Sequence, residues 1–212
     1  MPGYYPAFFN VRGKSCVVIG GGKVALRKVR TLLAHGANVK VVSPYLCLEL
    51  SQLADSGRIE VIRQNYQPGD LKGAFLVIAA ATSDVNKKVT DDARQEKALL
   101  NVADNPEQSD FIVPTCLHRG DLTIAVSTAG KSPALARKIR IGLEQHFSEE
   151  YAILITLVEE VRSELKERQI KVSGSDWAKA LDLDMLFSML RTGQREKAKA
   201  ALLEKLAGQS NT

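Results

Sequence analysis

The stretch Lys14-Ser15-Cys16-Val17-Val18-Ile19-Gly20-Gly21-Gly22-Lys23-Val24-Ala25 decides the fold of this chain of 212 residues. It begins with an apolar run typical of a buried strand, turns through three glycines and enters a helix. Gly20, Gly22 and Ala25 have the spacing of the dinucleotide fingerprint G-x-G-x-x-A. The first glycine permits a tight turn, the second lets the backbone approach a pyrophosphate, and the small third residue lets the helix pack against the strand. The free N–H groups and positive dipole end of the helix then face the phosphates.

The motif also predicts which residues contact the dinucleotide, namely Gly20, Gly21, Gly22, Lys23 and Val24. An acid at the end of the second strand commonly holds the ribose hydroxyls in such folds. Here that position falls at Ser43, before Pro44. A ribose hydrogen bond and an ordinary strand-ending turn both remain open for Ser43. The residues alone also leave open the choice between NAD and NADP, since no arginine pair for a 2′-phosphate is evident.

The first half of the chain alternates apolar runs with amphipathic segments, and this alternation predicts a Rossmann-like, doubly wound parallel sheet of the α/β class. The unbroken apolar run at 74–80 is typical of a strand that is covered on both faces. Gly36 is expected to end the first helix. The expected strands are 15–19, 39–42, 59–63, 74–80 and 99–103, and the expected helices are 23–35, 46–55 and 84–97.

The pattern changes after Asp104. Segments 111–113 and 122–126 are expected to be strands separated by a turn at 118–121. Ser132 and Pro133 then have the residue types of a helix N-cap and first helical position. Beyond residue 147 only helices are predicted, including one stripe with 3-4-3-4 spacing and helices at 176–190 and 194–206.

Composition narrows the class of protein. The hydrophobic fraction of 45% and the charged fraction of 25% are typical of a globular protein. No apolar run suggests a membrane span and no signal peptide is evident, so a cytoplasmic location without membrane contact is expected. Three scattered cysteines predict neither a disulfide framework nor a zinc site. The net charge of +5 suits a small polyanionic substrate, and no nucleic-acid motif accompanies it.

Polar or small residues follow three of the expected strands. Ala81 and Thr82 follow the strand at 74–80 and are expected to border the cofactor, although Thr82 also fits as a helix cap. Asp104 follows the strand at 99–103, where a carboxylate can act as general base, and Asp-Asn-Pro is also ordinary turn chemistry. His118, in an expected polar loop, is a candidate base or ligand, with a structural role as the alternative.

The loop before the helix at Pro133 is a candidate anion site. Hydroxyls, free N–H groups and an ammonium group suit a substrate carboxylate or phosphate. A capped helix with a solvated basic face explains the same residues. The candidate substrate contacts are Ser127, Thr128, Gly130, Lys131, Ser132 and His118.

Taken together, these motifs resemble the precorrin-2 dehydrogenase family of siroheme biosynthesis, some members of which are also sirohydrochlorin ferrochelatases. The resemblance spans nearly the whole chain and is least diagnostic in its helical C-terminal part. The residues that carry it are Tyr4-Tyr5-Pro6, Val18-Ile19-Gly20-Gly21-Gly22-Lys23-Val24-Ala25-Leu26-Arg27-Lys28, Ala81-Thr82-Ser83-Asp84 with Asn86, Asn101-Val102-Ala103-Asp104, Phe111-Ile112-Val113-Pro114, Arg119-Gly120-Asp121-Leu122 and Ser127-Thr128-Ala129-Gly130-Lys131-Ser132-Pro133-Ala134-Leu135-Ala136-Arg137.

The resemblance implies NAD-dependent dehydrogenation of precorrin-2 to sirohydrochlorin by a homodimer. The family's key aspartate falls on Asp104, where it would assist proton removal. The implied layout is a Rossmann domain over 1–113, a small α+β dimerisation segment over 114–146 and an all-helical C-terminal domain over 147–212. The substrate carries many carboxylates, which agrees with a basic chain. Its pyrrolic nitrogens would hold any metal, so no resident metal site is expected.

Two alternatives remain at this stage. Bifunctional relatives also insert Fe²⁺ into sirohydrochlorin, and the same Asp104 would then help to deprotonate the macrocycle. A dinucleotide-sensing module without catalysis is the other alternative, and it leaves the 127–137 block and the helical tail unexplained.

Overall fold

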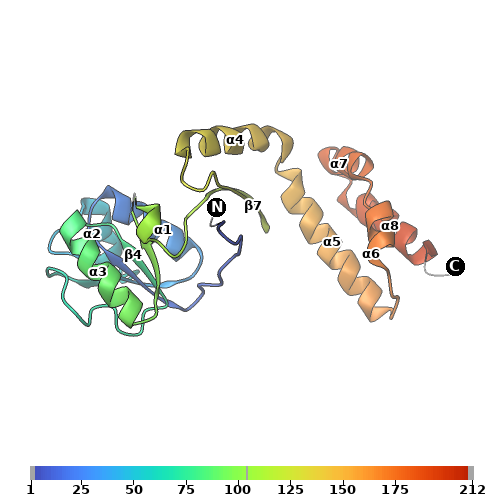
Figure 1. The fold of residues 1–212 in the computed structure, drawn as a ribbon. Helices are drawn as coiled ribbons and strands as arrows, with labels where there is room; N and C mark the ends of the chain where they lie inside the picture. The colour runs from blue at the N-terminus through green and yellow to red at the C-terminus, as the bar shows by residue number, and fades with distance from the viewer. Residues whose placement is uncertain (1–2, 104, 210–212) are drawn as a thin grey trace. The chain divides into compact units, whose positions relative to one another are not determined.

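A computed structural model describes residues 3–103 and 105–209 of the chain. Contacts between residues divide it into two compact units, Met1–Val113 and Pro114–Thr212 (Figure 1). The threefold division into a Rossmann domain, a dimerisation segment and a helical domain remains a prediction.

The first unit contains a parallel sheet of five strands in the order β3-β2-β1-β4-β5. The chain winds outward from β1 to β3 and then returns to β4 on the other side of β1, which is the doubly wound topology that the sequence predicts. The strands are β1 Ser15–Ile19, β2 Asn38–Val42, β3 Glu60–Ile62, β4 Leu76–Ala79 and β5 Leu99–Val102, and the helices are α1 Lys23–Ala34, α2 Leu48–Asp55, α3 Ser83–Gln95 and the 3₁₀ turn η1 Pro106–Gln108.

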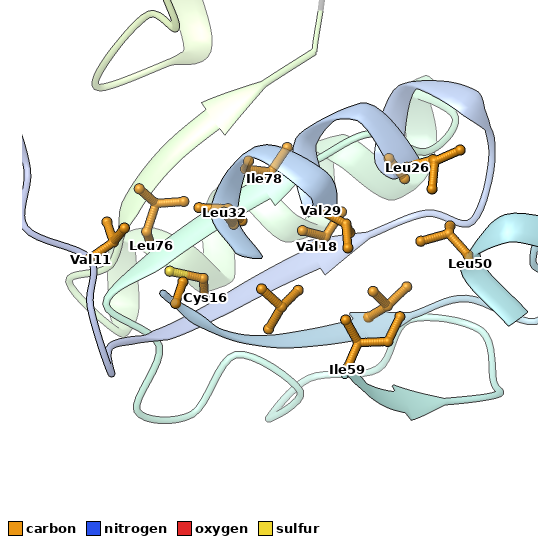
Figure 2. Close-up of a cluster of buried hydrophobic side chains, with 14 residues drawn as sticks. Val11, Cys16, Val18, Leu26, Val29, Leu32, Leu50, Ile59, Leu76 and Ile78 are labelled. Carbon is orange, nitrogen blue, oxygen red and sulfur yellow. The ribbon is translucent and has the colours of Figure 1, made fainter. Parts of the chain in front are cut away.

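Alternation along the strands divides the apolar side chains between two cores. On one face Cys16 and Val18 of β1 pack with α1 and α2, and Figure 2 shows Val29 and Leu32 of α1 directed toward these strand residues. On the other face Val17 and Ile19 of β1 and Val77 and Ala79 of β4 pack with Val89 of α3. Because both faces are covered, β4 is buried along its whole length.

The second unit begins with the antiparallel hairpin of β6 Thr115–Arg119 and β7 Leu122–Val126, followed by α4 Pro133–His146. Four further helices pack around a separate core that includes Leu157, Val161, Leu186, Leu202 and Leu206. They are α5 Glu150–Glu167, α6 Gly174–Ala180, α7 Leu183–Arg191 and α8 Arg195–Gln209. Within the described ranges, no helix is long and apolar enough to cross a membrane.

Three local predictions are wrong. Segment 111–113 is not a strand, because the carbonyl of Phe111 accepts a side-chain hydrogen bond from Asn101 rather than joining a ladder. His118 and Arg119 belong to β6, so the turn contains only Gly120 and Asp121. The expected helix at 176–190 is two helices, since the Asp182 side chain accepts from the Met185 N–H and caps α7.

Candidate functional site

The strands of the first unit end in register at one edge of the sheet. Ile19 pairs with Val42 on one side and with Ala79 on the other, and Ala79 pairs in turn with Val102. The residues that follow these strands therefore emerge side by side at the carboxyl edge. This edge, at the point where the strand order reverses between β1 and β4, is where open α/β sheets bind ligands.

The first two glycines of the turn are required by the protein's own packing. Gly20 has φ +122, and a Cβ there would lie 2.3 Å from the carbonyl oxygen of Ala80. A Cβ on Gly21 would lie 1.8 Å from the carbonyl oxygen of Tyr45. Backbone from two neighbouring segments thus presses against the turn, and a side chain at either position would displace it.

Gly22 differs from its neighbours. Its backbone is extended, with φ −91 and ψ −171, and a Cβ there would have no atom of residues 3–103 or 105–209 within 4 Å. The described part of the chain therefore places no demand on glycine at this position. The open space lies at the start of α1, where Gly22 is the N-cap, no side chain caps the helix and the first turn holds no acid.

This arrangement fits a dinucleotide pyrophosphate. The first N–H groups of α1 have no partner within the helix, and the helix dipole favours an anion there. Ala25, the third residue of the fingerprint, is fully buried, as close packing of helix and strand requires. Lys23 and Val24, also predicted to contact the cofactor, form the first exposed turn of the helix. When bound, such a dinucleotide supplies a hydride acceptor.

The loop after β2 is fixed against the glycine turn. The buried Ser43 hydroxyl donates to the carbonyl oxygen of Tyr45 at 2.7 Å, and the Cys47 N–H donates to the carbonyl oxygen of Gly21 at 2.8 Å. Ser43 thus has the strand-ending turn role that the sequence left open. Its contact with a ribose, and that of the exposed Pro44, remain predictions.

The loop after β4 borders the same edge. The Ala80 N–H donates to the carbonyl oxygen of Ile19 at 2.8 Å and continues the ladder beyond the strand. Thr82 is the N-cap of α3 and makes no side-chain capping bond. Instead the buried Asn86 side chain accepts from the Ala81 N–H at 3.1 Å and donates to the Ala81 carbonyl at 3.3 Å. Asn86 therefore positions this loop, a role that sequence patterns did not assign to it.

Asp104, the predicted catalytic residue, lies outside the described residues. The segments on either side of it are held to β5. The buried Asn101 side chain donates to the Phe111 carbonyl at 3.0 Å and accepts from the Lys28 ammonium at 3.4 Å. The Ser109 hydroxyl accepts from the Val102 N–H at 2.9 Å. The chain on both sides of position 104 is thus anchored to the sheet.

The predicted substrate residues lie in the second unit. The Ser127 hydroxyl accepts from the Ala129 N–H, the Thr128 hydroxyl accepts from the Ser132 N–H, each at 3.0 Å, and the Ser132 hydroxyl caps α4. These contacts belong to the capped-helix alternative. Gly130, with φ +81, and Lys131 are exposed in the same loop. The contacts of these residues with a substrate remain predictions.

His118 is exposed on β6, and its Nδ1 lies 3.0 Å from the Thr123 hydroxyl. Its place on a regular strand replaces the polar loop expected from the sequence. Burial raises the pKa of the Cys16 thiol to about 11 and also raises the pKa of Cys116. Cys16 is therefore a buried apolar residue at neutral pH, as expected. In the described ranges, no three His, Cys, Asp or Glu residues are grouped to hold a metal ion.

Comparisons with known proteins find relatives for both units of the chain. Residues 7–115 match the family described as putative NAD(P)-binding, and residues 119–146 match the sirohaem biosynthesis protein central family. The chain is 38% identical over 208 residues to a siroheme synthase of Nitrosococcus oceani, covering 97% of this chain and 44% of that protein. A siroheme synthase of Chromobacterium violaceum is 35% identical over 207 residues, which are 96% of this chain and 44% of that protein. The chain thus spans less than half the length of these curated relatives.

One solved structure is similar to this chain over nearly its whole length. The chain is similar to SirC, a precorrin-2 dehydrogenase, with a TM-score of 0.72 and 25% sequence identity. The similarity includes 97% of this chain and 100% of that structure. Both the parallel sheet and the second unit therefore have counterparts in one known protein.

Proposed function

Because the chain belongs to the putative NAD(P)-binding family and shares the central segment of sirohaem biosynthesis proteins, we propose that it dehydrogenates precorrin-2 to sirohydrochlorin with NAD. The observation that carries this proposal is the similarity to a precorrin-2 dehydrogenase along 97% of the chain. The open Gly22 position at an uncapped helix start supports the dinucleotide part of it.

The reaction removes two hydrogen atoms from precorrin-2, one as a hydride that NAD accepts and one as a proton. In this proposal the glycine turn and the first turn of α1 bind the pyrophosphate, and the Ala81–Thr82 backbone, fixed by Asn86, borders the cofactor. Asp104 accepts the proton. Its carboxylate is the proposed general base because its place in the chain matches the family's key aspartate.

The substrate is a tetrapyrrole with many carboxylates, and we assign the 127–132 loop to their binding. Lys131 is exposed there, and α4 adds Arg137 and Lys138 on its exposed surface. Ammonium and guanidinium groups form charge-assisted hydrogen bonds with carboxylates. His118 is the remaining proposed substrate contact.

We further propose a homodimer formed through the middle segment. Helix α4 exposes Leu135, Ile139 and Ile141, which are 51%, 42% and 44% exposed. Apolar side chains of this size on a short helix favour burial against a partner. A second copy of the chain is the proposed partner. A cytoplasmic location is the accompanying prediction.

Insertion of Fe²⁺ into sirohydrochlorin is a second candidate activity, since the curated relatives carry the name siroheme synthase and siroheme contains iron. In that activity the iron is a substrate and the pyrrolic nitrogens are its ligands. Two of these nitrogens lose a proton, and Asp104 would accept these protons one at a time and pass each to solvent.

The test is an anaerobic spectroscopic assay of precorrin-2 oxidation with NAD and, separately, with NADP. We expect faster turnover with NAD, and Asp104→Ala should lose turnover while it still binds NAD. NAD binding without turnover by the unaltered chain would instead indicate a dinucleotide-sensing module. Sirohydrochlorin with Fe²⁺ or Co²⁺, without NAD, tests the second activity, and a rate equal to the uncatalysed one would refute it.

A further inference from the structure

Tyr45 combines high exposure with a backbone that is fixed beside the glycine turn. The residue is 83% exposed, although it lies between the buried Ser43 and the first turn of α2. Its carbonyl oxygen accepts from the Ser43 hydroxyl at 2.7 Å and occupies the space that a Cβ on Gly21 would need. The Cys47 N–H bond to the Gly21 carbonyl closes the same loop at 2.8 Å. An aromatic side chain is thus presented to solvent from a rigid support.

The position of this loop matches the adenosine half of a dinucleotide. In doubly wound sheets the pyrophosphate lies at the start of the first helix, and the adenosine ribose lies at the end of the second strand. Here these places are Gly22 and Ser43. The adenine ring is attached to that ribose, so it lies beyond Ser43, beside the residues that begin the β2–α2 loop. Pro44 and Tyr45 are those residues.

The loop lacks the group that usually holds this half of the cofactor. Neither Ser43 nor its two neighbours on each side is an acid, and the proton of the Ser43 hydroxyl is donated to Tyr45. A neutral, flat adenine ring is well matched by an aromatic face, because stacking needs no charge and a tyrosine loses little conformational entropy when it is ordered.

The other tyrosine near this edge has a different environment. Tyr66 follows β3, and its hydroxyl donates to the Asp92 carboxylate of α3, which fixes the ring within the protein. In the part of the chain that the structure describes, the Tyr45 hydroxyl has no such bond. Its ring is available to a ligand.

We propose that Tyr45 is the platform on which the adenine ring of the dinucleotide stacks, and that this contact replaces the missing ribose acid. The proposal rests on the dinucleotide binding proposed above and adds a residue to that site. It assigns Tyr45 to cofactor affinity and gives it no part in proton transfer. Contacts of the protein with the nicotinamide half of the cofactor should not depend on Tyr45.

The experiment compares unaltered protein with Tyr45→Ala, Tyr45→Phe and the control Tyr5→Ala, which removes a ring that is 90% exposed in the N-terminal segment. Calorimetric titration with NAD and ADP-ribose should give dissociation constants roughly 5- to 100-fold higher for Tyr45→Ala. Tyr45→Phe, which keeps the aromatic face, and Tyr5→Ala should remain within about twofold of the unaltered protein.

A fluorescent analogue without the nicotinamide ring, 1,N⁶-etheno-ADP-ribose, supplies a readout that a merely structural role would not move. Its emission should be quenched when it binds the unaltered protein, and saturating Tyr45→Ala with the analogue should leave most of the emission. Equal quenching by Tyr45→Ala, or an unchanged ADP-ribose affinity, would overturn the proposal. Normal stacking without precorrin-2 turnover would refute the proposed reaction alone, whereas failure of the unaltered protein to bind NAD would refute both.

Discussion

The substitution Gly22→Asp separates dinucleotide binding from folding. A Cβ at this position meets no atom of the described residues within 4 Å, and the extended backbone is open to any residue. Asp is also a better N-cap than Gly by a few tenths of a kcal/mol, and a negative charge at a helix start adds about 0.3–1 kcal/mol. We therefore expect the variant to be as stable as the unaltered chain, or more stable by up to about 1 kcal/mol.

Binding should change in the opposite direction. One carboxylate about 5 Å from one phosphate charge costs about 3 kcal/mol at an effective dielectric constant of 20. Because 1.4 kcal/mol is tenfold in affinity, the dissociation constant for NAD should rise more than about a hundredfold. Gly22→Asn, which has nearly the same size and capping ability without the charge, is the matched control and should lose less affinity.

The assay is calorimetric titration with NAD beside thermal unfolding of the same samples. Unchanged NAD affinity in Gly22→Asp would refute the placement of the pyrophosphate at this turn. A large loss of stability in the same variant would instead refute the packing argument, because it would show that Gly22 is needed by the protein itself.

Three further predictions concern neighbouring parts of the first unit. Gly20→Ala should lower the free energy of unfolding by about 3 kcal/mol in urea denaturation, since its Cβ would lie 2.3 Å from a carbonyl oxygen at φ +122; full stability would contradict this. Asn86→Ala should lower the free energy of unfolding by about 1–3 kcal/mol and weaken NAD binding, because the Ala81 backbone loses its two hydrogen bonds to the Asn86 side chain. An unaltered NAD affinity would argue against the role of this loop in cofactor binding. Burial raises the pKa of Cys16 from 9.0 to about 11, so the unfolded chain releases this proton first and stability should fall between pH 9 and 11. Cys16→Ala should remove that part of the decline, with Cys47→Ala as the control thiol, and parallel pH profiles for all three proteins would refute the assignment.

The parallel sheet could be predicted because each of its strands has a local sequence signal. Apolar runs such as that of β4 need burial on both faces, and the Gly20-x-Gly22-x-x-Ala25 spacing admits few folds. The errors arose where a single tertiary contact decides the local structure. The Asn101 side chain takes the Phe111 carbonyl out of any ladder, and nothing in the sequence around Phe111 indicates this. The break between α6 and α7 did have a signal, because Asp182 is a good N-cap.

The position of the candidate site could be predicted from the sequence, but the contacts of its individual residues could not. The glycines and strand ends follow from spacing, whereas the opposite environments of Gly21 and Gly22 depend on where Tyr45 lies. The hydroxyl of Ser43 has a partner that only the folded loop reveals, and Asn86 acts across a turn on backbone atoms that carry no sequence signal. The substrate residues depend on the second unit, where the Ser127 and Thr128 hydroxyls bond within their own loop.

The central claim is that this chain transfers a hydride from precorrin-2 to a nicotinamide dinucleotide. The most direct test measures NADH and sirohydrochlorin together, in one anaerobic reaction of the purified chain with precorrin-2 and NAD. The account predicts that both appear at the same rate and in equal molar amounts, and that Gly22→Asp forms both about a hundredfold more slowly when NAD is below its dissociation constant. Sirohydrochlorin formed without NADH, or no NADH at all from a chain that binds NAD, would contradict it.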